Sequence, residues 1–131
     1  IARWIENYQN MVFYKWAICL KEKPDSVIGD ISVVDMDEAV NSCEVGYILS
    51  KDYWGQGLMT EALKAVLNYL LQDAGFNRVT ARFVTANPAS GRVMSKAGMS
   101  YEGTFRQAVF HKGQVKDFSV YGILKSDLEK G

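Results

Sequence analysis

Residues 53–62 read Tyr53-Trp54-Gly55-Gln56-Gly57-Leu58-Met59-Thr60-Glu61-Ala62, a glycine-containing turn that leads into a helical pattern. It lies between a strand-like run and the beginning of an amphipathic helix. Two glycines separated by one residue let the backbone approach a ligand with no Cβ in the way. The first N–H groups of a helix have no intrahelical acceptor, and the helix dipole adds positive charge there. The segment therefore predicts a turn that binds a phosphate or pyrophosphate.

The residues after the glycines narrow the kind of anion. No Lys-Ser or Lys-Thr pair follows them, so the turn is not a P-loop that binds a nucleoside triphosphate with magnesium. The dinucleotide fingerprint also fails, because Thr60 stands where its third glycine would be. On this segment alone, a tight strand–helix turn that binds nothing remains the alternative interpretation of Gly55 and Gly57.

Hydrophobic patterns on both sides of the turn predict a mixed α/β sheet. Alternating and β-branched runs predict strands at residues 12–20, 27–35, 42–50, 78–85, 100–110 and 114–124, with turns at 23–25, 36–41 and 111–113. Helical spacing predicts a long helix at residues 58–73, and Asn87-Pro88 begins a shorter one at 89–97, which Gly98 ends. Residues 1–10 resemble the tail of a helix. The order indicates an antiparallel meander, a helical crossover and a late hairpin.

Composition excludes several classes of function. The 131 residues suit one domain, and 15 basic side chains balance 15 acidic ones, so no general positive field exists for nucleic acid or an anionic membrane. No apolar run is long enough to span a bilayer, and no signal peptide is visible. Cys19, Cys43 and the single histidine, His111, fit no metal-binding spacing, and two cysteines are too few for a disulfide framework. We therefore expect a cytoplasmic protein with no metal.

A second segment, residues 87–99, follows the next strand and begins the next helix. With it, the chain resembles the GNAT acetyltransferases, especially the RimJ/RimL-type branch that includes the ribosomal-protein N-terminal alanine acetyltransferases. The family's phosphate motif, Gln/Arg-x-x-Gly-x-Gly/Ala, is matched at Gly55 and Gly57, although Asp52 replaces Gln or Arg. The second family motif is met by Asn87, Ser90, Lys96, Gly98, Glu102 and Gly103, with Met99 in place of Phe. Residues 116–121, KDFSVY, also look like this branch, so the resemblance covers nearly the whole chain.

The resemblance implies the GNAT fold with acetyl-CoA as cofactor. That fold has a mostly antiparallel sheet that splays between two parallel strands, here residues 42–50 and 78–85, with helices on both faces. Family members usually begin with a further strand and helix, so we expect residues 1–131 to be one N-terminally incomplete acetyltransferase domain. Those elements contribute to the acceptor side, which is therefore the least defined part. The family also forms homodimers through its late strands, and this sequence leaves that point open.

The resemblance also assigns residues to the cofactor and to the reaction. Those expected to bind acetyl-CoA are Ile48, Leu49, Ser50, Trp54, Gly55, Gln56, Gly57, Leu58, Met59, Thr60, Asn87, Ser90, Arg92 and Lys96. Glu44 is the expected base, Asn87 contacts the cofactor or a catalytic water, and Ser90 protonates the leaving thiolate. The alternatives are a solvated or substrate-binding Glu44, an Asx turn at Asn87, and a Ser90 that bonds only the first turn of its helix. Arg92 and Lys96 are either phosphate ligands or a solvated face.

Two departures from the family keep the function open. The tyrosine that often acts as general acid is Met94 here, and Val109 replaces an acid of some N-terminal acetyltransferases. The main hypothesis is acetyl transfer to a primary amine, either a protein or peptide N-terminus or a small amine such as a polyamine or an amino sugar. A non-catalytic acyl-CoA-binding module is the second class, and a nucleotide-binding protein is a third that the missing lysine disfavours.

Overall fold

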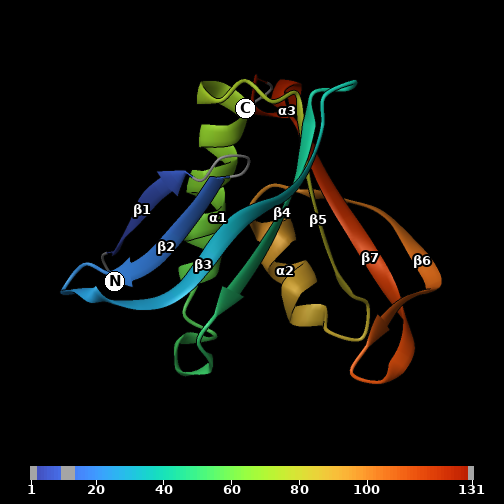
Figure 1. The fold of residues 1–131 in the computed structure, drawn as a ribbon, viewed down its shortest axis with the longest axis horizontal. Helices are drawn as coiled ribbons and strands as arrows, with labels where there is room; N and C mark the ends of the chain where they lie inside the picture. Colours follow the sequence, from blue (N-terminus) through green and yellow to red (C-terminus); the bar gives the residue numbers. More distant parts are fainter. Residues whose placement is uncertain (1–2, 10–13, 130–131) are drawn as a thin grey trace.

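The described residues form a seven-stranded mixed sheet (Figure 1). The computed structural model describes residues 3–9 and 14–129. The strands are β1 (Arg3–Gln9), β2 (Tyr14–Leu20), β3 (Lys23–Asp37), β4 (Ser42–Leu49), β5 (Arg78–Val84), β6 (Ser100–His111) and β7 (Gln114–Leu124). They lie in the order β1-β2-β3-β4-β5-β7-β6, and every neighbouring pair is antiparallel except β4 and β5. The predicted meander, crossover and late hairpin are confirmed.

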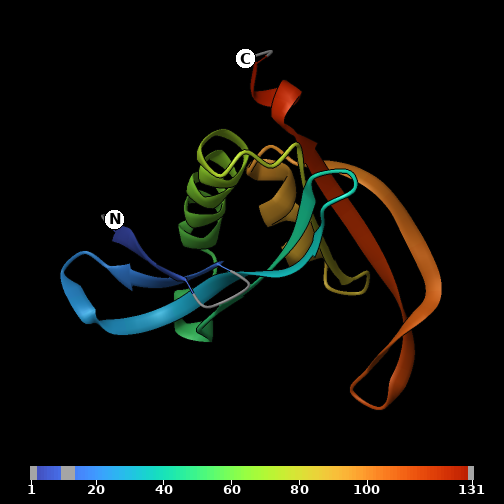
Figure 2. The same ribbon diagram turned by 45° about the horizontal axis from the view of Figure 1, so that its top comes forward.

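Two helices lie beside each other over one face of the sheet, as Figures 1 and 2 both show. They are α1 (Leu58–Asn68), which the π-helical turn η2 (Tyr69–Asp73) continues, and α2 (Pro88–Lys96). A 3-10 turn, η1 (Lys51–Tyr53), precedes α1, and the short α3 (Lys125–Glu129) follows β7. The sequence predicted helices on both faces, whereas in the described ranges α1 and α2 share one. No helix in this part of the chain is long and apolar enough to cross a bilayer.

The prediction of a helix tail at residues 1–10 is wrong within the described residues. Arg3–Gln9 is a strand that pairs with β2 along its whole length, from Arg3 opposite Leu20 to Gln9 opposite Tyr14. A segment this short has little helical stability of its own, whereas the backbone edge of β2 offers a hydrogen-bond partner at every second residue. Residues 1–2 and 10 lie outside the described part of the chain.

The first hairpin also turns earlier than the sequence suggested. Leu20 pairs with Lys23, so Lys21 and Glu22 form the turn, in place of residues 23–25. The pairing then shifts between Leu20 and Cys19, which leaves residues 24–26 in an irregular part of β3. Pro24 has no N–H for the ladder, and such a bulge is where a strand tolerates it.

One hydrophobic core fills the space between this sheet face and the two helices. The sheet contributes alternate residues, such as Ile31 and Val33 of β3 and Val79 of β5, and the helices contribute Leu63 and Met94. All five are at most 2% exposed. Alternation places the residues between them on the opposite face, so each strand near the centre has one helix-covered side and one open side.

Strands β4 and β5 separate after four paired positions, and this opening positions the site. They pair from Ser42 opposite Arg78 to Val45 opposite Ala81. Beyond that point β4 stays paired with β3, while β5 stays paired with β7. Gly91 of α2 packs against the opening, because a Cβ there would come within 2.9 Å of the Phe83 ring. The splayed pair that the family resemblance implied is confirmed.

An ion pair links β5 to β6 across the strand between them. Both terminal nitrogens of Arg78 donate to the Glu102 carboxylate, at 2.7 and 2.6 Å. A Cβ on Gly122 of β7 would overlap that carboxylate, so the glycine leaves room for the pair to cross β7 in this position. Glu102 belongs to the second family motif, and its contact here is structural.

We expect acid to lower the free energy of unfolding partly through this pair. Hydrogen bonding from Arg78 holds the pKa of Glu102 below its ordinary value of 4.5. The stabilisation is therefore complete above that ordinary value and is lost as the pH falls through the lower pKa of the folded protein. Since both side chains are partly exposed, it should amount to about 1 kcal/mol or less. Urea unfolding at about pH 7 and about pH 3 should show a smaller pH dependence for Glu102→Gln, and an unchanged one would contradict this assignment.

Candidate active site

An open cleft of about 480 Å³ lies where β4 and β5 separate, next to the first turns of α1 and α2. It brings both family motifs together, although they are far apart in the sequence. The residues expected to bind a cofactor that line it are Ile48, Leu49, Trp54, Gly55, Gly57, Leu58, Met59, Thr60, Asn87, Ser90, Arg92 and Lys96. The lining also includes Tyr47, Tyr53, Ala89 and Val93, which the sequence did not single out.

The glycine turn presents bare backbone to this cleft. Gly55 and Gly57 have φ angles of +77° and +75°, a region that residues with a Cβ rarely adopt, and a Cβ on either would meet nothing within 4 Å. Gly57 caps α1, and the first intrahelical bond runs from the Glu61 N–H to the Gly57 carbonyl at 3.1 Å. The three N–H groups before Glu61 thus have no acceptor inside the helix. They form an anion site whose side chains take little part, since Leu58 and Met59 are buried in the core.

Hydrogen bonds attach the turn to the end of β4. The indole N–H of Trp54 donates to the Leu49 carbonyl at 2.7 Å. The Ser50 N–H donates to the Ile28 carbonyl of β3 at 2.7 Å, and the Ser50 carbonyl accepts from Tyr53 at 2.9 Å. The N–H and the carbonyl of Ser50 are therefore both hydrogen-bonded within the protein. Neither Ser50 nor Gln56 lines the cleft. These two are the predicted cofactor-binding residues that the structure does not bring into the site.

The backbone of β4 has donors that face the open side. Antiparallel pairing alternates, so the bond from Ser50 toward β3 means that the Ile48 N–H also points to β3. The N–H groups of Tyr47 and Leu49 then point away from β3, into the gap that β5 has left. The sequence identified the right strand end, but the pairing register selects residues 47 and 49 as donors. Period-2 alternation counted back from the turn would have been the signal for Tyr47.

Asn87 and Ser90 meet at the beginning of α2. The Asn87 side-chain amide donates to the Ser90 hydroxyl oxygen at 3.3 Å, and both residues line the cleft. Because this hydroxyl accepts from Asn87, its own proton remains available to a group in the cleft. Asn87 caps α2 without a hydrogen bond from its side chain to the helix backbone. The arrangement thus differs from the Asx turn that was the alternative for Asn87.

Tyr47 fixes α2 to β4. Its hydroxyl donates to the Ser90 carbonyl at 3.2 Å, and burial raises the pKa of this phenol to about 12. The group therefore stays protonated at neutral pH. The position of the family's tyrosine is occupied by Met94, which is 1% exposed in the core. Arg92 and Lys96 are exposed, one helical turn apart, and add positive charge to the wall of the cleft.

Glu44 lies on the other face of the sheet and does not line the cleft. It alternates with the buried Cys43 and Val45, and its side chain is 17% exposed. Both carboxylate oxygens accept from Arg82 of β5, at 2.6 and 3.2 Å. The burial of Cys43 raises the pKa of its thiol to about 12, which fits a core residue and not a nucleophile.

Known proteins of similar sequence support the resemblance that the motifs indicated. Residues 1–100 match the family model described as an acetyltransferase (GNAT) domain. The chain is 35% identical over 107 residues to the probable N-acetyltransferase YjcK of Bacillus subtilis, covering 81% of this chain and 59% of that protein. It is 30% identical over 99 residues to the ribosomal-protein-serine acetyltransferase of Escherichia coli, covering 76% and 55%. This chain spans about three fifths of the length of the curated relatives it matches.

The fold also matches solved structures. The ribosomal-protein-S5-alanine acetyltransferase of Vibrio fischeri superposes with a TM-score of 0.82 over 88% of this chain and 63% of that one. Their sequences are 20% identical, so this likeness concerns the fold.

Proposed function

Because this chain belongs to the GNAT acetyltransferase family, we propose that it transfers an acetyl group from acetyl-CoA to a primary amine. The observation that carries the proposal is the meeting, in one cleft, of an open glycine turn, the gap between β4 and β5, and the Asn87–Ser90 pair. The family uses acetyl-CoA, and a turn whose glycines leave room for a ligand fits its pyrophosphate. When bound, acetyl-CoA supplies the acetyl group as a thioester.

Each part of the cleft has a separate task in binding. The N–H groups of residues 58–60 would hold the pyrophosphate, with the Thr60 hydroxyl as a further donor. Arg92 and Lys96 would neutralise phosphate charge at the rim. The N–H groups of Tyr47 and Leu49 would hold the amide-bearing arm in the gap between the strands. Of the remaining predicted cofactor residues, Trp54 keeps the turn in place through its bond to Leu49.

Proton transfer falls to side chains on both sides of the sheet. Ser90 Oγ would donate a proton to the leaving sulfur and regain one from water in the open cleft, while the Asn87 amide orients that hydroxyl. On the other face, Glu44 accepts the proton of the attacking amine through water, with Arg82 holding its carboxylate in place. Splitting the acid and the base between the two faces lets one side act on the thioester and the other on the amine.

A protein or peptide N-terminus is the acceptor that we propose. Its support is the similarity to the Escherichia coli ribosomal-protein-serine acetyltransferase, whose name specifies a protein substrate. A small amine, such as a polyamine or an amino sugar, is the competing outcome of the assay below. The expected cytoplasmic location and a homodimer stay predictions.

Calorimetry with acetyl-CoA and a thiol-release assay together test the proposed function. We expect binding in the micromolar range, which corresponds to about 8 kcal/mol, and release of CoA when a peptide with a free N-terminus is added. Binding without CoA release for any peptide, polyamine or amino sugar would instead indicate an acyl-CoA-binding module. If the folded chain does not bind acetyl-CoA, the assignment of the cleft is wrong.

A further inference from the structure

A row of four side chains crosses the sheet on the face opposite α1 and α2. Arg82 of β5 bonds to Glu44 of β4 through Nε and Nη2, at 2.6 and 3.2 Å. Its guanidinium carbon lies 4.6 Å from the centre of the Phe118 ring of β7. That ring stacks on Phe105 of β6, with 4.8 Å between the ring centres and 10° between the planes. We call these four residues the acceptor-side row.

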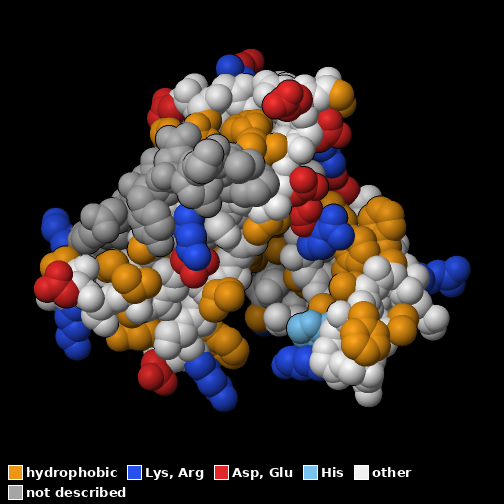
Figure 3. Space-filling view, viewed as in Figure 1, with side chains coloured by type: hydrophobic (Ala, Val, Ile, Leu, Met, Phe, Trp, Pro, Cys, Tyr) orange, Lys and Arg blue, Asp and Glu red, His pale blue; other side chains and the backbone are white. Residues whose placement is uncertain are grey.

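The row lies at the point where the sheet opens. Arg82 directly follows Ala81, the last residue of β5 that pairs with β4. On the helix side, α2 packs against the opening through the Tyr47–Ser90 bond and the Gly91–Phe83 contact, next to the cofactor cleft. An amine must therefore approach from the opposite side. Figure 3 shows that this face is hollowed between β4 and the β6–β7 hairpin.

Arg82 has N–H groups that its ion pair with Glu44 does not use. A guanidinium carries five N–H groups, and Glu44 uses one on Nε and one on Nη2, so both protons of Nη1 remain for a ligand. The side chain is 52% exposed, yet the ion pair and the Phe118 ring hold it in one place. A fixed guanidinium binds a carbonyl or carboxylate oxygen well and repels an ammonium group.

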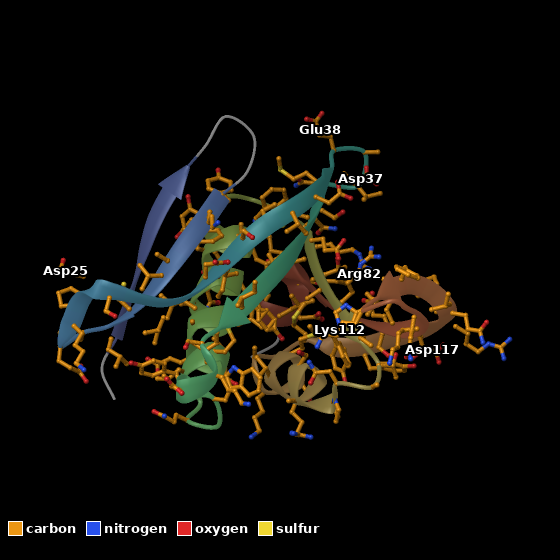
Figure 4. The ribbon with its side chains drawn as sticks, turned by 60° about the horizontal axis from the view of Figure 1, so that its bottom comes forward. Asp25, Asp37, Glu38, Arg82, Lys112 and Asp117 are labelled. Atoms are coloured by element: carbon orange, nitrogen blue, oxygen red, sulfur yellow. The ribbon has the colours of Figure 1, made fainter. Side chains whose placement is uncertain are left out.

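The neighbouring hairpin strengthens this selection. Between residues 105 and 118 it carries three cations, Arg106, Lys112 and Lys116, and one acid, Asp117, which gives a formal charge of 3 − 1 = +2. The Asp117 carboxylate already accepts the Gln107 N–H at 2.8 Å. Figure 4 shows Arg82 projecting from β5 beside this hairpin and Lys112 at its tip. A polyamine that extended over the hairpin would place its other ammonium groups beside these cations.

We propose that Arg82 selects the acceptor by binding an oxygen close to the reacting amine, as the first carbonyl group of a peptide provides. The aromatic pair Phe118 and Phe105 continues the row and offers an apolar surface to the side chains that follow. The acceptor is then a peptide N-terminus and not a polyamine. This inference rests on the proposed function and adds to it the residue that determines the acceptor.

The test compares two acceptors in two variants, with acetyl-CoA affinity measured alongside. In the wild type, kcat/KM should be higher for a short peptide with an N-terminal alanine than for spermidine. Arg82→Gln should lower kcat/KM for the peptide about 10- to 100-fold, mostly through KM, because a hydrogen bond to a charged group is lost. The value for spermidine should fall less, because both acceptors lose the support that Arg82 gives to Glu44, whereas only the peptide also loses its own bond to Arg82. Arg82→Lys keeps the positive charge but lacks the planar set of N–H donors of the guanidinium, so it should recover only part of the peptide activity.

Controls separate this inference from the proposed function and from misfolding. Lys64→Gln removes an exposed cation of α1 and should leave both acceptors unaffected. Thermal unfolding and acetyl-CoA binding should be close to wild type for the Arg82 variants. A wild type that prefers spermidine, or an Arg82→Gln variant that loses both activities equally, would overturn the role of Arg82 alone. Absence of acetyl-CoA binding, or of turnover with any amine, would overturn the proposed function instead.

Discussion

Gly57→Trp should lower the affinity for acetyl-CoA by about 100-fold or more, which corresponds to about 2.7 kcal/mol. The new side chain has room, since no atom lies within 4 Å of a Cβ at Gly57, but that room is the anion site itself. It would cover the N–H groups of the first turn of α1, which have no other partner in the helix. Calorimetric titration of the wild type and the variant measures the effect.

Gly75→Trp is the matched control for this substitution. Gly75 also has a positive φ, +84°, with nothing within 4 Å of a Cβ, so the backbone strain of the two substitutions is similar. It lies at the other end of the long helix, about 25 Å from the glycine turn along the helix axis, and does not line the cleft. Both variants should lose comparable stability, and only Gly57→Trp should lose acetyl-CoA. Equal losses of affinity would mean that strain, and not a blocked site, explains the result.

Ser90→Ala should lower kcat by about 100-fold or more while leaving the affinity for acetyl-CoA nearly unchanged. The expected size is that of removing a general acid, since Ser90 has a proton to give while its oxygen accepts from Asn87. The backbone contact of Ser90 to Tyr47 uses its carbonyl, so the alanine variant keeps that part of the structure. Steady-state kinetics with a peptide acceptor, at several pH values, measures the change.

Two further variants show whether Asn87 and Ser90 act together. Ser95→Ala changes an exposed serine of the same helix and should have wild-type kinetics. Asn87→Ala should lower kcat because the Ser90 hydroxyl loses its orienting donor. The double variant should be little worse than Ser90→Ala alone, as groups that act as a unit are not additive. A kcat of Ser90→Ala within about twofold of wild type would leave only the structural role of this serine.

The sequence predicted most of the elements because their signals are local. Period-2 runs located β2 to β7, and helical spacing located residues 58–73 and 89–97, each within a few residues of the observed bounds. Residues 3–9 have no such signal, and only pairing with β2 makes them a strand. The predicted turn at 23–25 failed for the same reason, because the register between β2 and β3 sets where a hairpin turns.

The candidate site likewise combines residues that the sequence identifies with contacts that exist only in the folded sheet. Gly55 and Gly57 can be identified from sequence, because a positive φ at the beginning of a helix strongly favours glycine. The contrast between Ile48, whose N–H points to β3, and Leu49, whose N–H points to the gap, depends on which strand lies on each side. The partnership of Glu44 with Arg82 joins residues 38 positions apart, which no local pattern encodes.

The sequence alone was enough to place β2 to β7, α1 and α2 within a few residues and to identify the backbone that can hold an anion. These properties follow from steric limits and periodicities that act over a few neighbouring residues. Only the tertiary structure decided that β4 and β5 stop pairing at Val45 and Ala81, that α2 closes one side of the opening and that Arg82 stands on the other. The physical reason is that each of these features depends on strand register and on contacts between distant segments, which exist only once the sheet has formed.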